Sequence, residues 1–259
     1  MGKLVHFEKA DGIAIVTIDN PPMNVLSNQV VTELGEIFTS IAEDPEVIVT
    51  ILTGSGNRAF MAGADIKEFP QLIENQDKKA TVMKTHHVLN QIDFLSKPTI
   101  AVLNGITFGG GCELALTCDL RIAETHAQIG LPEIKLGLFP GGGGTQRLPR
   151  LIGKAKAKEL MFTGEPISAE EGARIGLVNQ VVPSGEGLEA ARKLAQKIAG
   201  YSLQALSRIK RAVDEGAELA FESAVEREAD LFVEVFETED VKEGVQGFIE
   251  KRVPKFKHK

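Results

Sequence analysis

Two glutamates, Glu113 and Glu133, have side chains whose surroundings suggest proton-transfer chemistry. Glu113 stands two positions after three consecutive glycines and precedes apolar residues, and Glu133 lies between Pro132 and Ile134. Two carboxyl groups in different environments can act as a general base and a general acid, because the environment decides which one is ionised. Each glutamate alone also has an ordinary explanation. A helix N-terminus favours a carboxylate such as Glu113, and a single loop glutamate such as Glu133 usually faces solvent.

Three glycine-rich segments are candidates for a site. Residues 109–111 lie where a strand is expected to lead into a helix, and unpaired N–H groups there could bind an anion, although a plain tight turn fits equally well. Residues 141–144 lack the Gly-Lys-Ser/Thr of a P-loop, so we expect their backbone to pack closely against a ligand or another segment. Residues 54–59 fit a dinucleotide-binding pattern, but no apolar helix follows, which favours a surface turn.

The elements that must position these residues can be predicted from periodicity and capping. A hairpin with an Asp-Gly turn is expected over residues 4–18, a helix capped by Ser27 over 29–42, and a capping box at residues 168–171. Only helical patterns follow residue 188. Strands alternating with helices predict an α/β core. The further expected strands cover 47–52, 99–103, 119–123 and 178–182, and the further helices cover 78–95 and begin at Gly111 and after residue 144.

Composition limits the possible partners of the chain. Of its 259 residues, 43% are hydrophobic and 25% are charged, and the net charge of −7 argues against nucleic acid as the main partner. We find no secretory signal and no apolar run of the roughly 20 residues that a membrane span needs. Cys112 and Cys118 are expected to be buried thiols in a reducing compartment, and the protein is expected to be cytoplasmic. The five histidines show no metal-ligand spacing, so no metal site is expected.

The motifs, taken together and in order, resemble the crotonase, or enoyl-CoA hydratase/isomerase, family, and in particular its short-chain hydratases. The resemblance covers nearly the whole chain. Its segments are Asn20-Pro21-Pro22, Ala62-Gly63-Ala64-Asp65-Ile66-Lys67-Glu68, Asn104-Gly105, Gly109-Gly110-Gly111-Cys112-Glu113-Leu114-Ala115, Pro132-Glu133, Gly137, Pro140-Gly141, Gly143-Gly144-Thr145-Gln146-Arg147-Leu148, Gly172-Ala173, Gly176-Leu177-Val178 and Lys251-Arg252.

The resemblance implies an α/β fold built as a spiral of repeated β-β-α units. This catalytic core would occupy residues 1–190, and residues 191–259 would form a helical segment that assembles homotrimers, of which two stack into a hexamer. It also implies an oxyanion hole made by the backbone N–H groups of Ala64 and Gly110. Gly141 would help to hold a water molecule. The implied coenzyme A contacts come from Val25, Ala62, Ala64, Asp65, Ile66, Lys67, Phe248 and Lys251. The last two would reach coenzyme A from a neighbouring subunit or from the same helix bundle.

The activity implied by the resemblance is reversible addition of water to a trans-2-enoyl-CoA in fatty-acid β-oxidation or related acyl-CoA breakdown. Glu113 at a helix N-terminus would be the ionised base, and Glu133 among apolar residues would be the neutral acid. No cofactor is expected beyond the coenzyme A of the substrate. The alternatives are a methylglutaconyl-CoA hydratase or an enoyl-CoA isomerase on the same scaffold. An RNA-binding role through Arg208, Lys210 and Arg211 is disfavoured by the acidic body of the chain.

Overall fold

The larger of two β-sheets begins with the predicted hairpin. In this computed structural model, which describes residues 2–259, β1 (Val5–Ala10) and β2 (Ile13–Ile18) are antiparallel and turn at Asp11 and Gly12, both of which have positive φ. Every later strand of this sheet runs parallel to its neighbours. The order across the sheet is β1 (Val5–Ala10), β2 (Ile13–Ile18), β3 (Val49–Gly54), β5 (Thr99–Leu103), β7 (Leu120–Glu124) and β10 (Gln180–Val182).

A second, smaller sheet was not predicted. Its strands have only two or three residues, too few to show an alternating apolar pattern, and one of them lies inside a glycine-rich segment. The first three strands are parallel and the last is antiparallel to its neighbour. The order is β4 (Ala59–Met61), β6 (Ile106–Phe108), β8 (Gln128–Gly130) and β9 (Ile167–Ser168).

The two sheets alternate along the chain, which confirms the predicted spiral of β-β-α units. A strand of the larger sheet is followed by a strand of the smaller sheet and then by helix, as in β5, β6 and α4 (Gly110–Ala115). The same step recurs in β3, β4 and the following helices η1 (Ile66–Glu68), α2 (Phe69–Glu74) and α3 (Lys78–Asp93). It recurs again in β7, β8 and the helices η2 (Pro132–Leu136), α5 (Gly144–Ile152) and α6 (Lys154–Thr163).

The strands β2, β3 and β5 in the parallel part of the larger sheet are buried on both faces and consist mainly of apolar residues. Alternate residues of β2 point to opposite sides: Ile13 and Ile15 belong to one apolar cluster, and Ala14 and Val16 belong to the other. The cluster with Val16 is covered by α1 (Asn28–Glu43), which begins at the predicted cap, where the Ser27 hydroxyl accepts from the Val30 N–H at 3.3 Å. The predicted cap at Ser168 is also present at the start of α7 (Ala169–Arg174).

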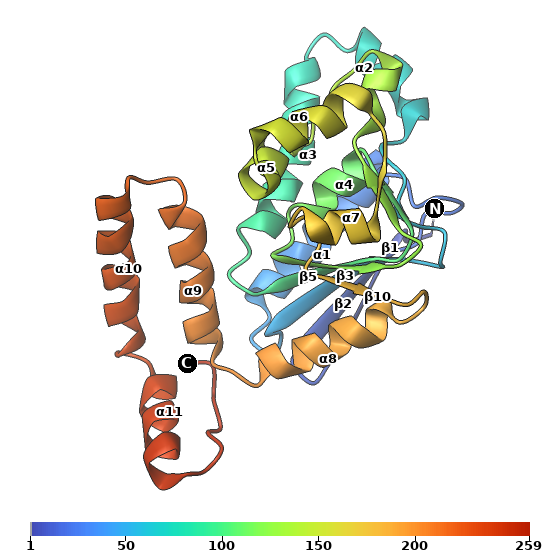
Figure 1. Ribbon diagram of the computed structural model, residues 1–259. Coiled ribbons are helices and arrows are strands. Elements are labelled where there is room, and N and C mark those ends of the chain that lie inside the picture. The colour runs from blue at the N-terminus through green and yellow to red at the C-terminus, as the bar shows by residue number, and fades with distance from the viewer. Residues whose placement is uncertain (1) are drawn as a thin grey trace.

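The C-terminal helices divide into two groups (Figure 1). Helix α8 (Gly187–Ala199) covers the other face of the larger sheet through Ala191 and Ala195, so the predicted boundary at residue 190 falls inside a helix that packs with the core. Helices α9 (Leu203–Gly216), α10 (Phe221–Val235) and α11 (Glu239–Glu250) stand to one side of the sheets (Figure 1). Among residues 2–259, no helix combines the length and the apolar character that a membrane crossing requires.

Candidate active site

The register of the smaller sheet brings Glu113 and Glu133 to the same place. Phe108 on β6 pairs with Gly130 on β8, and the Gly109 N–H donates to the Gly130 carbonyl at 2.9 Å. The chain then leaves β6 into α4, which carries Glu113, and leaves β8 into η2, which carries Glu133. A Cβ atom on Gly109 would lie 3.1 Å from Glu133 Oε1. Two glutamates that are 20 positions apart in the chain therefore face one site.

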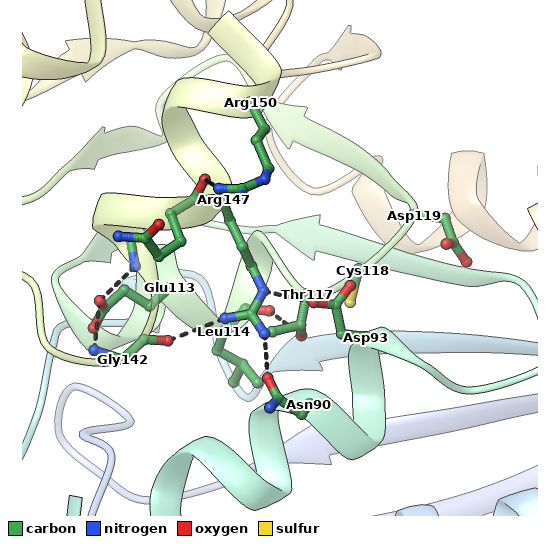
Figure 2. A network of polar contacts seen from close by, with 12 residues as sticks. Asn90, Asp93, Glu113, Leu114, Thr117, Cys118, Asp119, Gly142, Arg147 and Arg150 are labelled. Carbon is green, nitrogen blue, oxygen red and sulfur yellow. Dashed lines mark hydrogen bonds and ion pairs between the residues drawn. The ribbon is translucent and has the colours of Figure 1, made fainter. Parts of the chain in front are cut away.

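The carboxylate of Glu113 is buried and held by the backbone of the 141–144 loop. Its Oε1 accepts hydrogen bonds from the N–H groups of Gly142 at 2.7 Å and Gly144 at 2.8 Å (Figure 2). Burial raises the pKa of Glu113, and these two N–H donors oppose that rise. The sequence suggested that the N-terminus of α4 favours the ionised form of Glu113. In the structure, burial is the largest influence on this pKa, and the N–H donors that favour the ionised form come from another segment.

Glu133 lies in a different environment. It is half-buried in the first turn of η2, and among residues 2–259 no donor lies within hydrogen-bonding distance of its buried Oε2. Burial raises the pKa of Glu133 to about 7, and the charge of Glu113 acts in the same direction. The apolar setting predicted from the sequence is therefore present. Glu133 is ready to carry a proton near neutral pH, whereas Glu113 has two donors that favour its ionised form.

Two backbone N–H groups, those of Ala64 and Gly110, lie beside the glutamates. A Cβ atom on Gly110 would be 3.6 Å from the Ala64 nitrogen, so the two segments approach closely. Within the described part of the chain, neither N–H donates a hydrogen bond. Gly110 is the first residue of α4, where N–H groups have no partner inside the helix. The pair can therefore donate to a ligand oxygen.

Close packing and backbone conformation explain the glycines of the segments 109–111 and 141–144. Gly109 has a φ of 51°, and a side chain on Gly111 would collide with the Met61 carbonyl of β4. A Cβ atom on Gly142 would lie 2.6 Å from Glu113 Oε2. The close packing predicted for this loop is therefore against the side chain of Glu113. Gly141 is exposed, and its predicted role in holding water is untested.

The predicted coenzyme A contacts fall into two groups. Val25 lies beside residues 62–67, because Leu26 forms a parallel bridge to Ala64 and donates to the Gly63 carbonyl at 2.8 Å. Asp65 caps η1 by accepting from the Lys67 N–H at 3.1 Å, which leaves the side chains of Ile66 and Lys67 exposed. The C-terminal pair is not part of this group. Phe248 and Lys251 lie at the end of α11, at the opposite end of the molecule from α2 (Figure 1).

Three polar residues behind the 141–144 loop were not predicted to act at the site. Arg147 on α5 contacts Asp93 and Asn90 on α3 and also the Gly142 carbonyl (Figure 2). An arginine one turn after a run of glycines is the only signal that the sequence offers for this network. No sequence pattern indicates its partners, because α3 is more than 50 positions away.

The predicted basic cluster is neutralised by acidic neighbours. Arg208 pairs with Glu234 at 3.3 Å, and Lys210 pairs with Asp119 at 2.9 Å. Arg211 likewise pairs with an acidic residue, at 3.1 Å. These pairs leave little free positive charge for a nucleic acid backbone.

Cys112 and Cys118 are buried thiols, as expected, and burial raises the pKa of each. No group of three or more His, Cys, Asp and Glu side chains suited to a metal ion occurs within residues 2–259.

Comparison with known proteins decides the family. The model of the enoyl-CoA hydratase/isomerase family matches residues 8–259. The chain belongs to this family. Among relatives of the same family, a short-chain-enoyl-CoA hydratase of Clostridium acetobutylicum is 41% identical, and the match covers 96% of this chain and 95% of the relative. A crotonyl-CoA hydratase of Syntrophomonas wolfei is 42% identical, with 97% of each chain covered.

Solved structures of the enoyl-CoA hydratase/isomerase family have the same fold. The crystal structure of an enoyl-CoA hydratase from Bacillus anthracis superposes with a TM-score of 0.94 at 39% identity, covering 99% of this chain and 100% of that one. The α/β spiral and the C-terminal helices that we predicted are therefore confirmed as the fold of this family.

Proposed function

We propose that this protein is an enoyl-CoA hydratase, which adds water reversibly across the double bond of a trans-2-enoyl-CoA in fatty-acid β-oxidation or related acyl-CoA breakdown. The observation that carries the proposal is the placement of two glutamates with different hydrogen-bond environments beside two unpaired backbone N–H groups. The names of the hydratase relatives support the same activity.

The N–H groups of Ala64 and Gly110 would bind the thioester oxygen of the substrate. When water attacks Cβ, the electrons of the double bond move toward this oxygen and form an enolate. Two preorganised donors stabilise that charge, and removal of one such donor typically costs about 2.7–4 kcal/mol in the transition state. The segment 62–67 and Val25, which lie next to this pair, are the proposed contacts for the coenzyme A portion.

The two glutamates would divide the proton transfers. Glu113, whose Oε1 is held by two N–H donors, accepts a proton from the attacking water, and the oxygen of that water bonds to Cβ. Glu133, whose pKa is raised by burial to about 7, gives its proton to Cα. We propose that Gly141 helps to hold the water. The carboxyl pair exchanges a proton before the next turnover, so its apparent pKa values belong to the pair. The residues supply all the chemistry of this scheme, so we propose no metal or redox cofactor.

The test is a product analysis with three substrates. We expect the purified protein to convert crotonyl-CoA to 3-hydroxybutanoyl-CoA, followed as loss of the conjugated thioester absorbance and confirmed by mass spectrometry. Parallel reactions contain methylglutaconyl-CoA and a 3-enoyl-CoA. Fastest turnover of methylglutaconyl-CoA would assign the alternative hydratase, and double-bond migration without hydration would assign an isomerase. No turnover of any of the three would reject the proposal.

We further propose that the protein assembles as a homotrimer, or as a hexamer of two trimers. Large apolar side chains of the C-terminal helices, including Phe221, Phe232 and Phe248, are 78%, 63% and 86% exposed in one chain, more than an isolated subunit usually leaves in water. An assembly would also allow Phe248 and Lys251 of one subunit to approach the coenzyme A site of another. Light scattering should give a mass of three or six chains, and Phe248→Asp should lower it. A monomeric wild type would contradict the proposal.

We place the protein in the cytoplasm of its cell. The two buried, unpaired cysteines support a reducing compartment. Cell fractionation followed by activity measurement tests this placement.

A further inference from the structure

We propose that Arg147 is a positioning residue for Glu113, acting through the backbone of the 141–144 loop. In this role Arg147 fixes the loop so that the N–H groups of Gly142 and Gly144 both reach one oxygen of Glu113 (Figure 2). The inference rests on the proposed function, because it gives Glu113 the task of activating water.

All three nitrogen atoms of the Arg147 guanidinium are used. Nε donates to Asp93 Oδ2 at 2.6 Å, and Nη2 donates to Asn90 Oδ1 at 2.7 Å, so two residues of α3 fix the orientation of the group. The remaining nitrogen, Nη1, donates to the Gly142 carbonyl at 3.2 Å. The Arg147 side chain is only 16% exposed, which protects these contacts from solvent. A rigid planar fork suits this task, since its donors keep fixed directions.

Gly142 is thereby held from two sides. Its N–H donates to Glu113, and its carbonyl accepts from Arg147. The next residue, Gly143, has a φ of 105°, and a Cβ atom there would collide with Nη1 of Arg147. The glycine at 143 therefore allows the guanidinium to cross the loop. No side chain caps the start of α5, and Arg147 links this loop to α3 by hydrogen bonds.

The loop geometry decides which oxygen of Glu113 is available to accept the proton from water. Both loop N–H groups converge on Oε1, and this leaves Oε2 free of them. Release of the loop would remove donors from the ionised carboxylate and let Oε1 and Oε2 exchange places. Burial raises the pKa of Glu113, while the loop N–H groups and the charge of Arg147 lower it. Loss of Arg147 is therefore expected to raise this pKa further.

Arg150 provides a matched control on the same helix. It lies one turn after Arg147 (Figure 2). Its side chain is 58% exposed, and it pairs with Glu218 at 2.7 Å rather than with the loop. Arg147→Met and Arg150→Met each remove one guanidinium from α5. Only the first removes the contact to Gly142.

The experiment measures kcat and KM for crotonyl-CoA hydration from pH 5 to 9 in the wild type, Arg147→Met, Arg147→Lys and Arg150→Met, with folding checked by circular dichroism. We expect Arg147→Met to lower kcat by about tenfold to a hundredfold, the size of effect that a small misplacement of a catalytic group produces. KM should stay within about threefold, because no substrate contact is removed. The acid limb of the kcat profile should move to higher pH, Arg147→Lys should restore part of kcat, and Arg150→Met should match the wild type.

Two results would overturn the inference while the wild type remains active. One is a kcat of Arg147→Met within about threefold of wild type, and the other is a lowered kcat with an unmoved acid limb, which indicates a general loss of structure. If Arg147→Met does not fold, Arg147→Lys decides: a lowered kcat with a raised acid limb supports the inference, and wild-type behaviour rejects it. An inactive wild type would instead reject the proposed function.

Discussion

Glu133→Gln is expected to lower kcat for crotonyl-CoA hydration by about 10²–10⁴-fold, and Glu113→Gln by a similar factor, because each removes one proton transfer. The fold should tolerate both changes. The amide oxygen of a glutamine at 113 can still accept from Gly142 and Gly144, and Glu133 Oε2 has no donor to lose among residues 2–259. The free energy of unfolding should therefore change by no more than about 1 kcal/mol. Steady-state kinetics and urea denaturation of the two variants test this.

The pH dependence separates the roles of the two glutamates. If Glu133 must carry a proton, kcat/KM of the wild type should fall about tenfold per pH unit above pH 7, because the pKa of Glu133 is raised by burial to about 7. Glu133→Gln should remove this descending limb, and Glu113→Gln should remove the ascending limb instead. Persistence of the descending limb in Glu133→Gln, or near-normal turnover in either variant, would contradict the assignment.

Gly110→Pro is expected to lower kcat/KM by about 10²–10³-fold relative to Gly110→Ala, because proline lacks the N–H that would stabilise the enolate. Gly110 is the first residue of α4, a position where proline is compatible with a helix. Its N–H donates to no acceptor in the described part of the chain, so the fold loses no hydrogen bond. The measurement is steady-state kinetics with crotonyl-CoA.

Gly110→Ala is the matched control for this substitution. Its Cβ atom would lie 3.2 Å from Leu26 Cδ2 and 3.6 Å from the Ala64 nitrogen, so it adds the crowding of the Cβ atom, which proline shares, but keeps the donor. Gly110→Ala is therefore expected to retain most of the activity that Gly110→Pro loses. Equal activities of the two folded variants would show that the Gly110 N–H does not stabilise the transition state.

The larger sheet could be predicted because local patterns determine it. The apolar runs of β2, β3 and β5 are long enough to show burial on both faces, and Ser27 and Ser168 have the caps that their neighbours predicted. The smaller sheet could not be predicted. Its strands of two or three residues depend on pairing with distant segments rather than on their own side chains.

The candidate site, too, could be predicted only where it depends on neighbours in the chain. The apolar neighbours of Glu133 in the chain indicated a raised pKa, and the structure agrees. The neighbours of Glu113 indicated a helix-terminus effect, but its pKa depends on burial and on a loop about 30 positions later. The contacts of Arg147 with Asp93 and Asn90 are also long-range, which explains why the sequence did not predict them.

The pairing of β6 with β8 has a consequence for how this chain can change in evolution. Phe108 opposite Gly130 sets where α4 and η2 begin, and so sets how far apart Glu113 and Glu133 lie. Close packing limits the side chains at Gly109 and Gly111, and the length of the segment is limited as well. A single inserted or deleted residue between positions 108 and 113 would rotate or displace one glutamate relative to the other. Relatives that retain hydration should therefore have the same segment lengths here, whatever substitutions they carry at other positions.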